Sequence, residues 1–319
     1  MRAISHQNGV RFLKQGQFIE FSIDDVNDFL EYRAKYLSHG TYVRMQNVLS
    51  QIWAISQGKI YRSTLEEITD YYMNRYPSDS GRDKFFNYTR AFLKYLYKIH
   101  MDNFSQSLYT LFEKPRRRRE IKLMTQRIMV VEDIQAAIKK IQNAPETDGR
   151  KPNWKSNYIT AILFLAYTGQ RPLTGAQVTV RQFKVALRQN PPVLTIEAAQ
   201  DKIRMAHYCP LHPVLIPPLT DLLSNKKDKE CLFNVIPLQT WLKNNPVRLH
   251  RTKGHLVLKD LRKFFEQKSD EIGFTDANKN FIMSHGVCSV NWKHYKGFLP
   301  ENVYKKYMEC WKDVEICSF

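Results

Sequence analysis

The chain has 319 residues, which is enough for two domains that each bury a core. Lys and Arg number 49 against 31 Asp and Glu, so the formal net charge is +18 and the pI is near 9.6. This excess indicates a polyanionic partner, DNA or RNA, whose counterions are released on contact. It disfavours a membrane protein, because no stretch approaches the roughly 18 apolar residues of a spanning helix. Residues 1–17 also lack the apolar core and cleavage site of a secretion signal.

Five cysteines occur in the chain: Cys209, Cys231, Cys288, Cys310 and Cys317. Their odd number and the absence of any Cys-x-x-Cys pair argue against a disulfide framework and against a structural zinc site. Free thiols are typical of a reducing compartment. We therefore expect an intracellular, cytoplasmic protein with no bound metal.

Residues 1–112 predict an N-terminal arm followed by a small bundle of four amphipathic helices. The arm, Ile4 to Phe21, reads as extended. Ser22 is an N-cap for the first helix, the second stops near Gly58, and a capping box at Ser63 to Glu66 opens the third. The fourth and longest helix is expected to point four apolar side chains inward: Phe85, Phe92, Leu96 and Ile99.

The bundle ends in a strongly basic stretch, residues 113–122, which contains Arg116, Arg117, Arg118 and Arg119. Four adjacent guanidinium groups repel one another and have no core to enter, so an exposed linker is expected here. A nuclear-import signal or a generic basic tail is the other interpretation. The position between two halves of a basic protein favours a linker that lies along DNA, with the domain boundary at this point.

Residues 123–319 predict a second domain that is mostly helical and has one small sheet. The run Tyr158 to Tyr167 is apolar nearly all round, as in a helix buried at a domain centre. Gly169 suits the left-handed position after that helix, and Pro172 prevents its continuation. Arg171 is therefore presented at the end of a buried helix.

A β-hairpin is predicted from Val193–Glu197 and Ile203–Tyr208, with Lys202 near its tip and Arg204 beside it. Both cations are candidates for contact with DNA. Further helices are expected at Pro213–Ser224, Pro237–Asn244, Lys259–Gly273, Asp276–Met283 and Pro300–Lys312.

Lys259 and Arg262 lie three residues apart and so share one face of a helix. Leu261, Phe264 and Phe265 fall on the opposite side and can root that helix in a core. Two rigid cations above an apolar base suit a phosphate. Taken alone, the same pattern also fits an ordinary amphipathic helix with solvated charges.

The order of these signals resembles that of the tyrosine recombinases, the phage-integrase type of site-specific recombinase. Thr168 to Arg171 closes a buried helix as the family's first arginine does, and Lys202 lies where the family places its hairpin lysine. Lys259 to Arg262 resembles the family's His-x-Leu-Arg box. Ser284-His285, followed by Tyr295, resembles the Gly-His step and the downstream nucleophile.

The resemblance implies a mainly α fold: a four-helix core-binding bundle and an α-rich catalytic domain with a small antiparallel sheet, as in topoisomerase IB. It implies a partner, double-stranded DNA, and a homo-oligomer, a tetramer on DNA. Three departures stand out. Lys259 stands where most members have His, and a lysine at this position is typical of the integrases of archaeal spindle-shaped viruses and related archaeal elements. Thr174 stands where many members have Glu, and Ser284 stands where Gly is usual.

The resemblance also implies a chemistry. Arg171 and Arg262 would clamp the scissile phosphate, with His285 as a further donor. Lys202 would protonate the leaving 5′-hydroxyl, and Tyr295 would form a 3′-phosphotyrosyl link without a metal or nucleotide cofactor. Lys259 would be either another donor to the phosphate or, if desolvated, a base near the tyrosine.

Several alternatives stay open. Tyr304 and Tyr307 rival Tyr295 as nucleophile, although Tyr307 has the spacing of a packing residue. Apolar residues after Pro300 would anchor a C-terminal element either in a neighbouring protomer or in the same chain. A type IB topoisomerase and a catalytically silent DNA-binding regulator are the rival functions.

Overall fold

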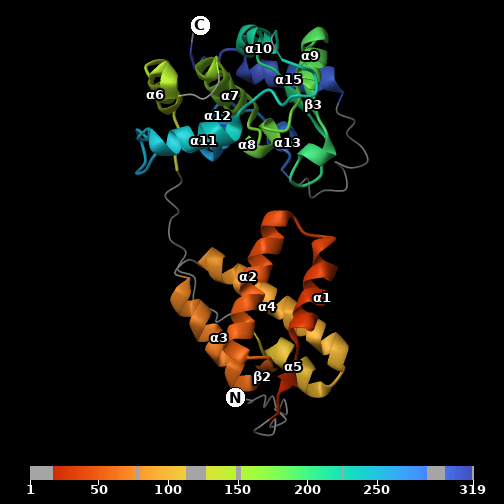
Figure 1. Ribbon diagram of the computed structural model, residues 1–319. Coiled ribbons are helices and arrows are strands. Elements are labelled where there is room, and N and C mark those ends of the chain that lie inside the picture. The colour runs from red at the N-terminus through yellow and green to blue at the C-terminus, as the bar shows by residue number, and fades with distance from the viewer. Residues whose placement is uncertain are drawn as a thin grey trace, which may run out of the picture. The chain divides into compact units, whose positions relative to one another are not determined.

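The computed structural model describes residues 17–76, 79–112, 127–148, 152–224, 226–285 and 299–317. The chain divides into two compact units, Met1–Lys122 and Leu123–Phe319 (Figure 1). Arg116 to Arg119 and Tyr295 fall outside the described residues. None of the described helices combines the length and the apolar character that a membrane span needs.

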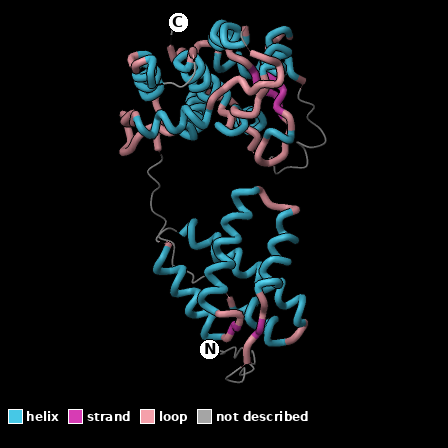
Figure 2. Tube along the Cα trace, viewed as in Figure 1, coloured by secondary structure: helices cyan, strands magenta, loops and turns pink. Residues whose placement is uncertain are grey.

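In its described part the first unit has five helices, one more than the sequence predicts, and a short strand pair (Figures 1 and 2). The strands β1 (Ile19–Glu20) and β2 (Lys59–Ile60) are antiparallel, so the end of the expected arm is paired rather than loose. The helices are α1 (Ile23–Ala34), α2 (His39–Ser56), α3 (Arg62–Arg75), α4 (Asp79–His100) and α5 (Asn103–Leu111).

The helix starts in this unit follow local capping. Ser22 caps α1 as predicted: its hydroxyl accepts from Asp25 N at 3.1 Å. The predicted start of α3 at the Ser63 capping box is wrong, because Tyr61 is the N-cap and its N–H donates to Thr64 Oγ1 at 3.2 Å. The unpredicted α5 begins after Asp102, whose side chain accepts from Ser105 N at 2.8 Å.

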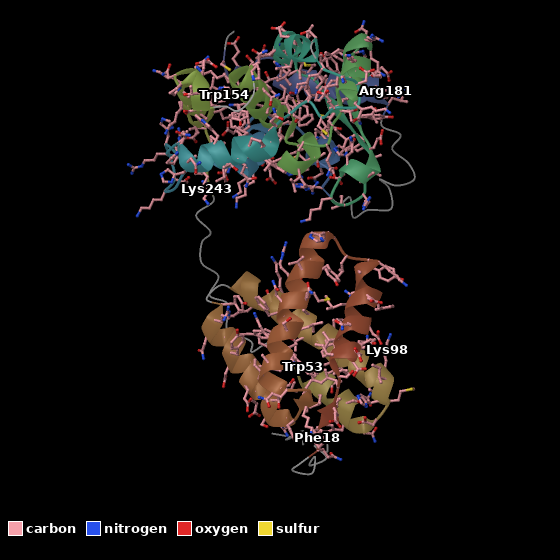
Figure 3. All side chains as sticks on the ribbon, in the orientation of Figure 1. Phe18, Trp53, Lys98, Trp154, Arg181 and Lys243 are labelled. Atoms are coloured by element: carbon pink, nitrogen blue, oxygen red, sulfur yellow. The ribbon has the colours of Figure 1, made fainter. Side chains whose placement is uncertain are left out.

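An aromatic core holds the first unit together. Phe21 packs edge-on against Trp53 and Phe92, with ring centroids 5.3 Å apart in both pairs. Trp53 is half-buried within the unit, and Lys98 lies exposed at its edge (Figure 3). Ile99, predicted to point inward, is 47% exposed, because the last turn of α4 extends past the core.

The second unit is mostly helical around one two-stranded antiparallel sheet, as predicted (Figure 2). Its strands are β3 (Val193–Ile196) and β4 (His207–Pro210). Its described helices are α6 (Val131–Gln142), α7 (Trp154–Thr168), α8 (Pro172–Gly175), α9 (Val180–Arg188), α10 (Ile216–Leu223), α11 (Val235–Asn244), α12 (Leu258–Glu271), α13 (Asp276–Ile282) and α15 (Pro300–Trp311).

Helix α7 is the centre of this unit. Every residue from Asn157 to Thr168 is buried, as its all-round apolar sequence predicts. Helices α6, α10, α11 and α12 pack against it. Trp154, at the start of α7 (Figure 3), donates from its indole nitrogen to Glu146 O at 3.1 Å.

The predicted second strand of the hairpin is misplaced. It begins at His207, not Ile203, and pairs Ile196 with His207 and Val193 with Pro210. Arg204 has a positive φ of 57°, which is far from the extended conformation of a β-strand, and a turn at 202–203 followed by irregular chain to 206 takes the place of the predicted strand start. Lys202 therefore lies in a wide connection rather than at a tight tip.

The C-terminal segment packs within its own chain. The Tyr307 hydroxyl donates to Tyr167 O at 2.9 Å, and the Trp311 ring stacks on Phe265 with centroids 4.7 Å apart. Beyond α15, Val314 and Ile316 are also buried. Tyr307 and Trp311 are thus core residues of their own chain in this structure, and exchange of the element between protomers on DNA stays a prediction.

Candidate active site

Arg171 is presented by a sharp turn at the end of α7. Gly169 has a φ of 62°, and a Cβ there would lie 2.5 Å from a ring carbon of Phe265. Glycine is therefore required on two grounds, backbone conformation and close packing. Arg171 then takes an extended conformation as the N-cap of α8, with Pro172 at the first helical position.

Three acceptors hold the Arg171 guanidinium. Nη1 donates to Asp201 Oδ1 at 2.8 Å and to Ser284 Oγ at 3.3 Å, and Nη2 donates to Ser284 O at 3.2 Å. The side chain keeps 23% of its surface exposed. Arg171 is thus fixed from one side and open on another.

Protein acceptors also hold the Arg262 guanidinium, and here both are backbone carbonyls. Its Nη1 donates to Gly169 O at 2.7 Å and its Nη2 to Met283 O at 2.6 Å. Burial, followed by the charge of Arg171, lowers the pKa of Arg262 from 12.5 to about 10. Arg262 therefore joins the turn that presents Arg171 to Met283, which adjoins the Ser284 that Arg171 binds, and the charges of the two arginines act on each other.

Helix α12 carries Arg262 as the sequence predicts, with Leu261, Phe264 and Phe265 buried beneath it. Lys259 differs from Arg262 in its surroundings. It is exposed, and it makes no hydrogen bond or ion pair with any residue that the structure describes. Between them, Asp260 is buried and forms an ion pair with Arg127 at 3.0 Å.

His285 follows the turn at the end of α13. Its backbone N–H donates to Asn280 O at 2.8 Å, and the imidazole Nδ1 lies 3.3 Å from Asn280 Oδ1. Partial burial, then the charge of Arg262, lowers the pKa of His285 below 6.5. The imidazole is therefore mostly neutral at pH 7 and has one N–H, which is on Nδ1 when it donates to Asn280 Oδ1 and on Nε2 when it donates to another acceptor.

Lys202 and Arg204 lie in the turn after Asp201, and both are exposed. Within the described residues neither side chain has a hydrogen-bond or ion-pair partner. The connection of Lys202 to the arginine pair runs along the chain: its neighbour Asp201 forms an ion pair with Arg171.

Of the three candidate nucleophiles, Tyr304 and Tyr307 are described, and they differ in burial. Burial raises the pKa of Tyr307 well above its ordinary value, and its hydroxyl is occupied by Tyr167 O. Tyr304 is half-buried, and burial raises its pKa as well. Tyr295 lies outside the described residues. Within them no three His, Cys, Asp or Glu side chains form a group that could hold a metal ion.

Sequence reasoning missed the polar residues behind the arginines. Gln170 donates to Ile282 O at 2.7 Å, and its Oε1 lies 3.1 Å from His207 Nε2. Asp201 and Ser284 bind Arg171 directly. One signal pointed to Asp201: Thr174 leaves the first arginine without the usual nearby acid, and Asp201 adjoins the candidate Lys202.

No family model and no curated protein sequence matches the chain. Solved structures do match. A lambda integrase tetramer bound to a Holliday junction has a TM-score of 0.60 and 10% identity, and the match covers 86% of this chain and 80% of that one. The Tn1549 transposon integrase in complex with circular intermediate DNA has a TM-score of 0.55 and 11% identity over 90% and 98% of the two chains. The protein therefore has the tyrosine recombinase fold, a mainly helical fold with small antiparallel sheets.

Proposed function

We propose that this protein is a site-specific DNA recombinase that cleaves and rejoins DNA through a 3′-phosphotyrosyl intermediate. The observation that carries the proposal is the arginine pair: Arg262 bonds to Gly169 O and Met283 O, Arg171 bonds to the adjacent Ser284, and the charges of both arginines act on His285. Two like charges are brought together at an energetic cost, which an anion bound between them would relieve. The fold shared with DNA-bound integrases supports the same interpretation.

In the proposed reaction, the remaining N–H groups of the two arginines and, in its Nε2–H tautomer, the imidazole of His285 bind the nonbridging oxygens of one phosphate. The Tyr295 oxygen bonds to phosphorus as the P–O5′ bond breaks. The phenol gives up its proton to water or, where Lys259 is the base, to the Lys259 amine, and Lys202 supplies one to the departing 5′-oxygen. Attack by a 5′-hydroxyl reverses these steps and restores a phosphodiester, so the bond energy is conserved and the route needs no nucleotide cofactor.

The first unit and the basic linker would bind the DNA on either side of that phosphate. A groove of about 690 Å³ in the first unit is lined by Arg44, Arg75, Lys84 and Tyr88 among others, a mixture suited to a nucleic-acid backbone. Arg116 to Arg119 and Arg204 add sequence-independent charge. Assembly as a tetramer on DNA is part of the proposal.

Lys259, in place of the usual His, supports a finer proposal: integration or excision of a mobile element of the archaeal spindle-shaped virus type. The protein would then act in the reducing cytoplasm of the host. The four described cysteines, Cys209, Cys231, Cys310 and Cys317, are all free thiols, as that compartment allows.

The test is trapping on nicked DNA. The protein is incubated with a library of nicked duplexes whose sequence is random around the nick, and DNA that stays linked to protein after denaturation is sequenced. Digestion after glutamate yields 272–301, whose one tyrosine is Tyr295, and 302–309, which holds Tyr304 and Tyr307. We expect the nucleotide on the first peptide.

The matched control is Tyr295→Phe, which should bind DNA normally and form no adduct. An adduct on peptide 302–309 would overturn the assignment of Tyr295. If no DNA in the library becomes linked to the unmodified protein, the proposed function is wrong. Relaxation of supercoiled DNA with no sequence preference would instead favour a topoisomerase.

A further inference from the structure

A buried carboxylate, Asp201, joins three parts of the candidate site. Its Oδ1 accepts from Arg171 Nη1 at 2.8 Å, and its Oδ2 accepts from Ser284 Oγ at 2.6 Å and from Ile203 N at 3.1 Å. The residue is 3% exposed. Most of the roughly four hydrogen bonds that a carboxylate can accept are thus committed to the turn after α7, the turn after α13, and its own loop.

The contact with Ile203 organises the turn that carries Lys202. A side chain that accepts from the N–H two residues ahead forms an Asx turn, which fixes the backbone of the residue between them. Here that residue is Lys202. Arg204 N closes the same turn by donating to Asp201 O at 3.1 Å. The Lys202 side chain is free, but its attachment point is fixed relative to Arg171.

Ser284 holds the other side of this carboxylate. It is fully buried and has a φ of 52°, a left-handed conformation that is strained for a residue other than glycine. Its hydroxyl donates to Asp201 and accepts from Arg171. A glycine would adopt this backbone without strain but could make neither contact. The serine therefore has a use at this position that offsets its strain.

Charge favours the same arrangement. Burial alone would raise the pKa of Asp201, but hydrogen bonds from Ser284 and Ile203 and the charge of Arg171 outweigh it and keep the pKa below 3.8. Asp201 is thus ionised at neutral pH, facing two arginines and His207. Its charge offsets that of Arg171, with which it pairs, while Glu266 and then Asp201 offset that of Arg262.

From this geometry we infer that Asp201 is a positioning residue: it ties the turn that bears Lys202 to Arg171, with Ser284 as the second anchor. The inference rests on the proposed function. During cleavage, Lys202 must deliver a proton to the 5′-oxygen of the phosphate that Arg171 binds. In this role Asp201 fixes the position of the Lys202 backbone relative to Arg171, and it does not itself contact the DNA.

The test compares two leaving groups on the DNA that the trapping experiment yields. One substrate carries the normal 5′-oxygen at the cleaved bond and the other carries a bridging 5′-sulfur. A thiol is much more acidic than an alcohol, so the P–S bond breaks without a proton from Lys202. Asp201→Asn should slow cleavage of the oxygen substrate on the order of 10²-fold, and cleavage of the sulfur substrate about tenfold less than that.

Asp228→Asn is the matched control, since Asp228 also pairs with a cation, Lys184, at 2.8 Å but lies exposed elsewhere. It should cleave both substrates like the unmodified protein. Equal losses on the two substrates for Asp201→Asn, or no loss, would overturn the inference while the unmodified protein still forms its adduct. If the unmodified protein forms none, the proposed function fails and the inference fails with it.

Two variants of Ser284 test whether a loss of cleavage comes from lost positioning or from lost stability. Ser284→Ala and Ser284→Gly both remove the hydroxyl, but only glycine relieves the left-handed strain, so the glycine variant should unfold at higher urea. We expect both variants to lose cleavage of the oxygen substrate to a similar extent. Cleavage that follows stability, with the glycine variant near the unmodified protein, would overturn the role of the hydroxyl.

Discussion

The two arginines and the two lysines of the candidate site carry the same charge in opposite ways. Arg171 and Arg262 are partly or largely buried, and protein acceptors hold both guanidinium groups. Lys202 and Lys259 are exposed, and neither side chain has a partner among the described residues. The difference suggests a division of labour. In the proposed function, the two fixed arginines would bind one phosphate in a defined position, and the two exposed lysines would gain partners only when DNA binds.

The largest effect is expected for the fixed pair. Arg171→Ala or Arg262→Ala should reduce cleavage on the order of 10³-fold, because each removes donors aimed at developing charge. Arg262→Lys should be nearly as damaging, since an ammonium group cannot hold Gly169 O and Met283 O as a planar fork does. Single-turnover cleavage measures the loss, and exposed Arg181→Ala is the control (Figure 3). A lysine variant with full activity would break the comparison.

The turn beneath the arginines comes next. Gly169→Ala should destabilise the second unit by about 2–4 kcal/mol, because the methyl group meets Phe265 and φ is positive. Cleavage should fall as well, since Gly169 O holds Arg262. Gly273→Ala is the matched control: φ is also positive there, but the added Cβ meets nothing within 4 Å, so we expect only about 1 kcal/mol. Urea unfolding compares the two, and equal losses would reject the steric argument.

Lys202 should show the largest effect of the free pair. Lys202→Ala should reduce cleavage of a normal phosphodiester about 10²-fold while leaving DNA affinity nearly unchanged. Lys229→Ala, another exposed lysine in the same unit, serves as the control. A variant that loses affinity and cleavage in parallel would make Lys202 a simple phosphate contact.

A smaller effect on cleavage is expected for Lys259. Lys259→His restores the residue usual in the resembled family, and should change cleavage by no more than about tenfold if Lys259 only donates to the phosphate. The rate should then also be flat with pH above neutrality. A rate that rises with pH in the unmodified protein, but not in the histidine variant, would favour Lys259 as the base.

The smallest effect concerns pH. Burial lowers the pKa of His207, His212 and His285 below 6.5. Because the unfolded chain then binds more protons, the free energy of unfolding should fall as pH drops below about 6.5 and recover above it. Urea midpoints between about pH 8 and pH 5.5 test this, and His212→Gln should flatten the slope. The Asp201 contribution would disappear only at lower pH, below its ordinary 3.8. A midpoint constant across the range would contradict the prediction.

Much of the scaffold could be predicted because its signals are local. The apolar run of α7, the left-handed Gly169 and the buried side of α12 follow from periodicity and backbone chemistry. Arg171 and Arg262 were identified from motif spacing. The start of α3 and the extent of β4 could not be fixed, because single-residue choices such as Thr64 at N3 and the positive φ of Arg204 decide them.

The network behind the arginines was beyond sequence reasoning for a different reason. Asp201 and Ser284 are 83 residues apart, and only the folded turn brings the carboxylate to the hydroxyl. A lone aspartate in a loop reads as a solvated charge, and a serine before a histidine reads as a neutral replacement for glycine. Their joint role appears only when both meet Arg171.

The tail beyond α15 is fastened to the helix that presents Arg171. The Tyr167 hydroxyl donates to Val314 O at 3.0 Å and accepts from Ile316 N at 3.1 Å, about one turn before the arginine. An affinity tag placed after Phe319 would therefore be attached close to a segment bonded to the helix that presents Arg171, whereas a tag before residue 17 is joined to the other unit, so the second position suits the cleavage assays.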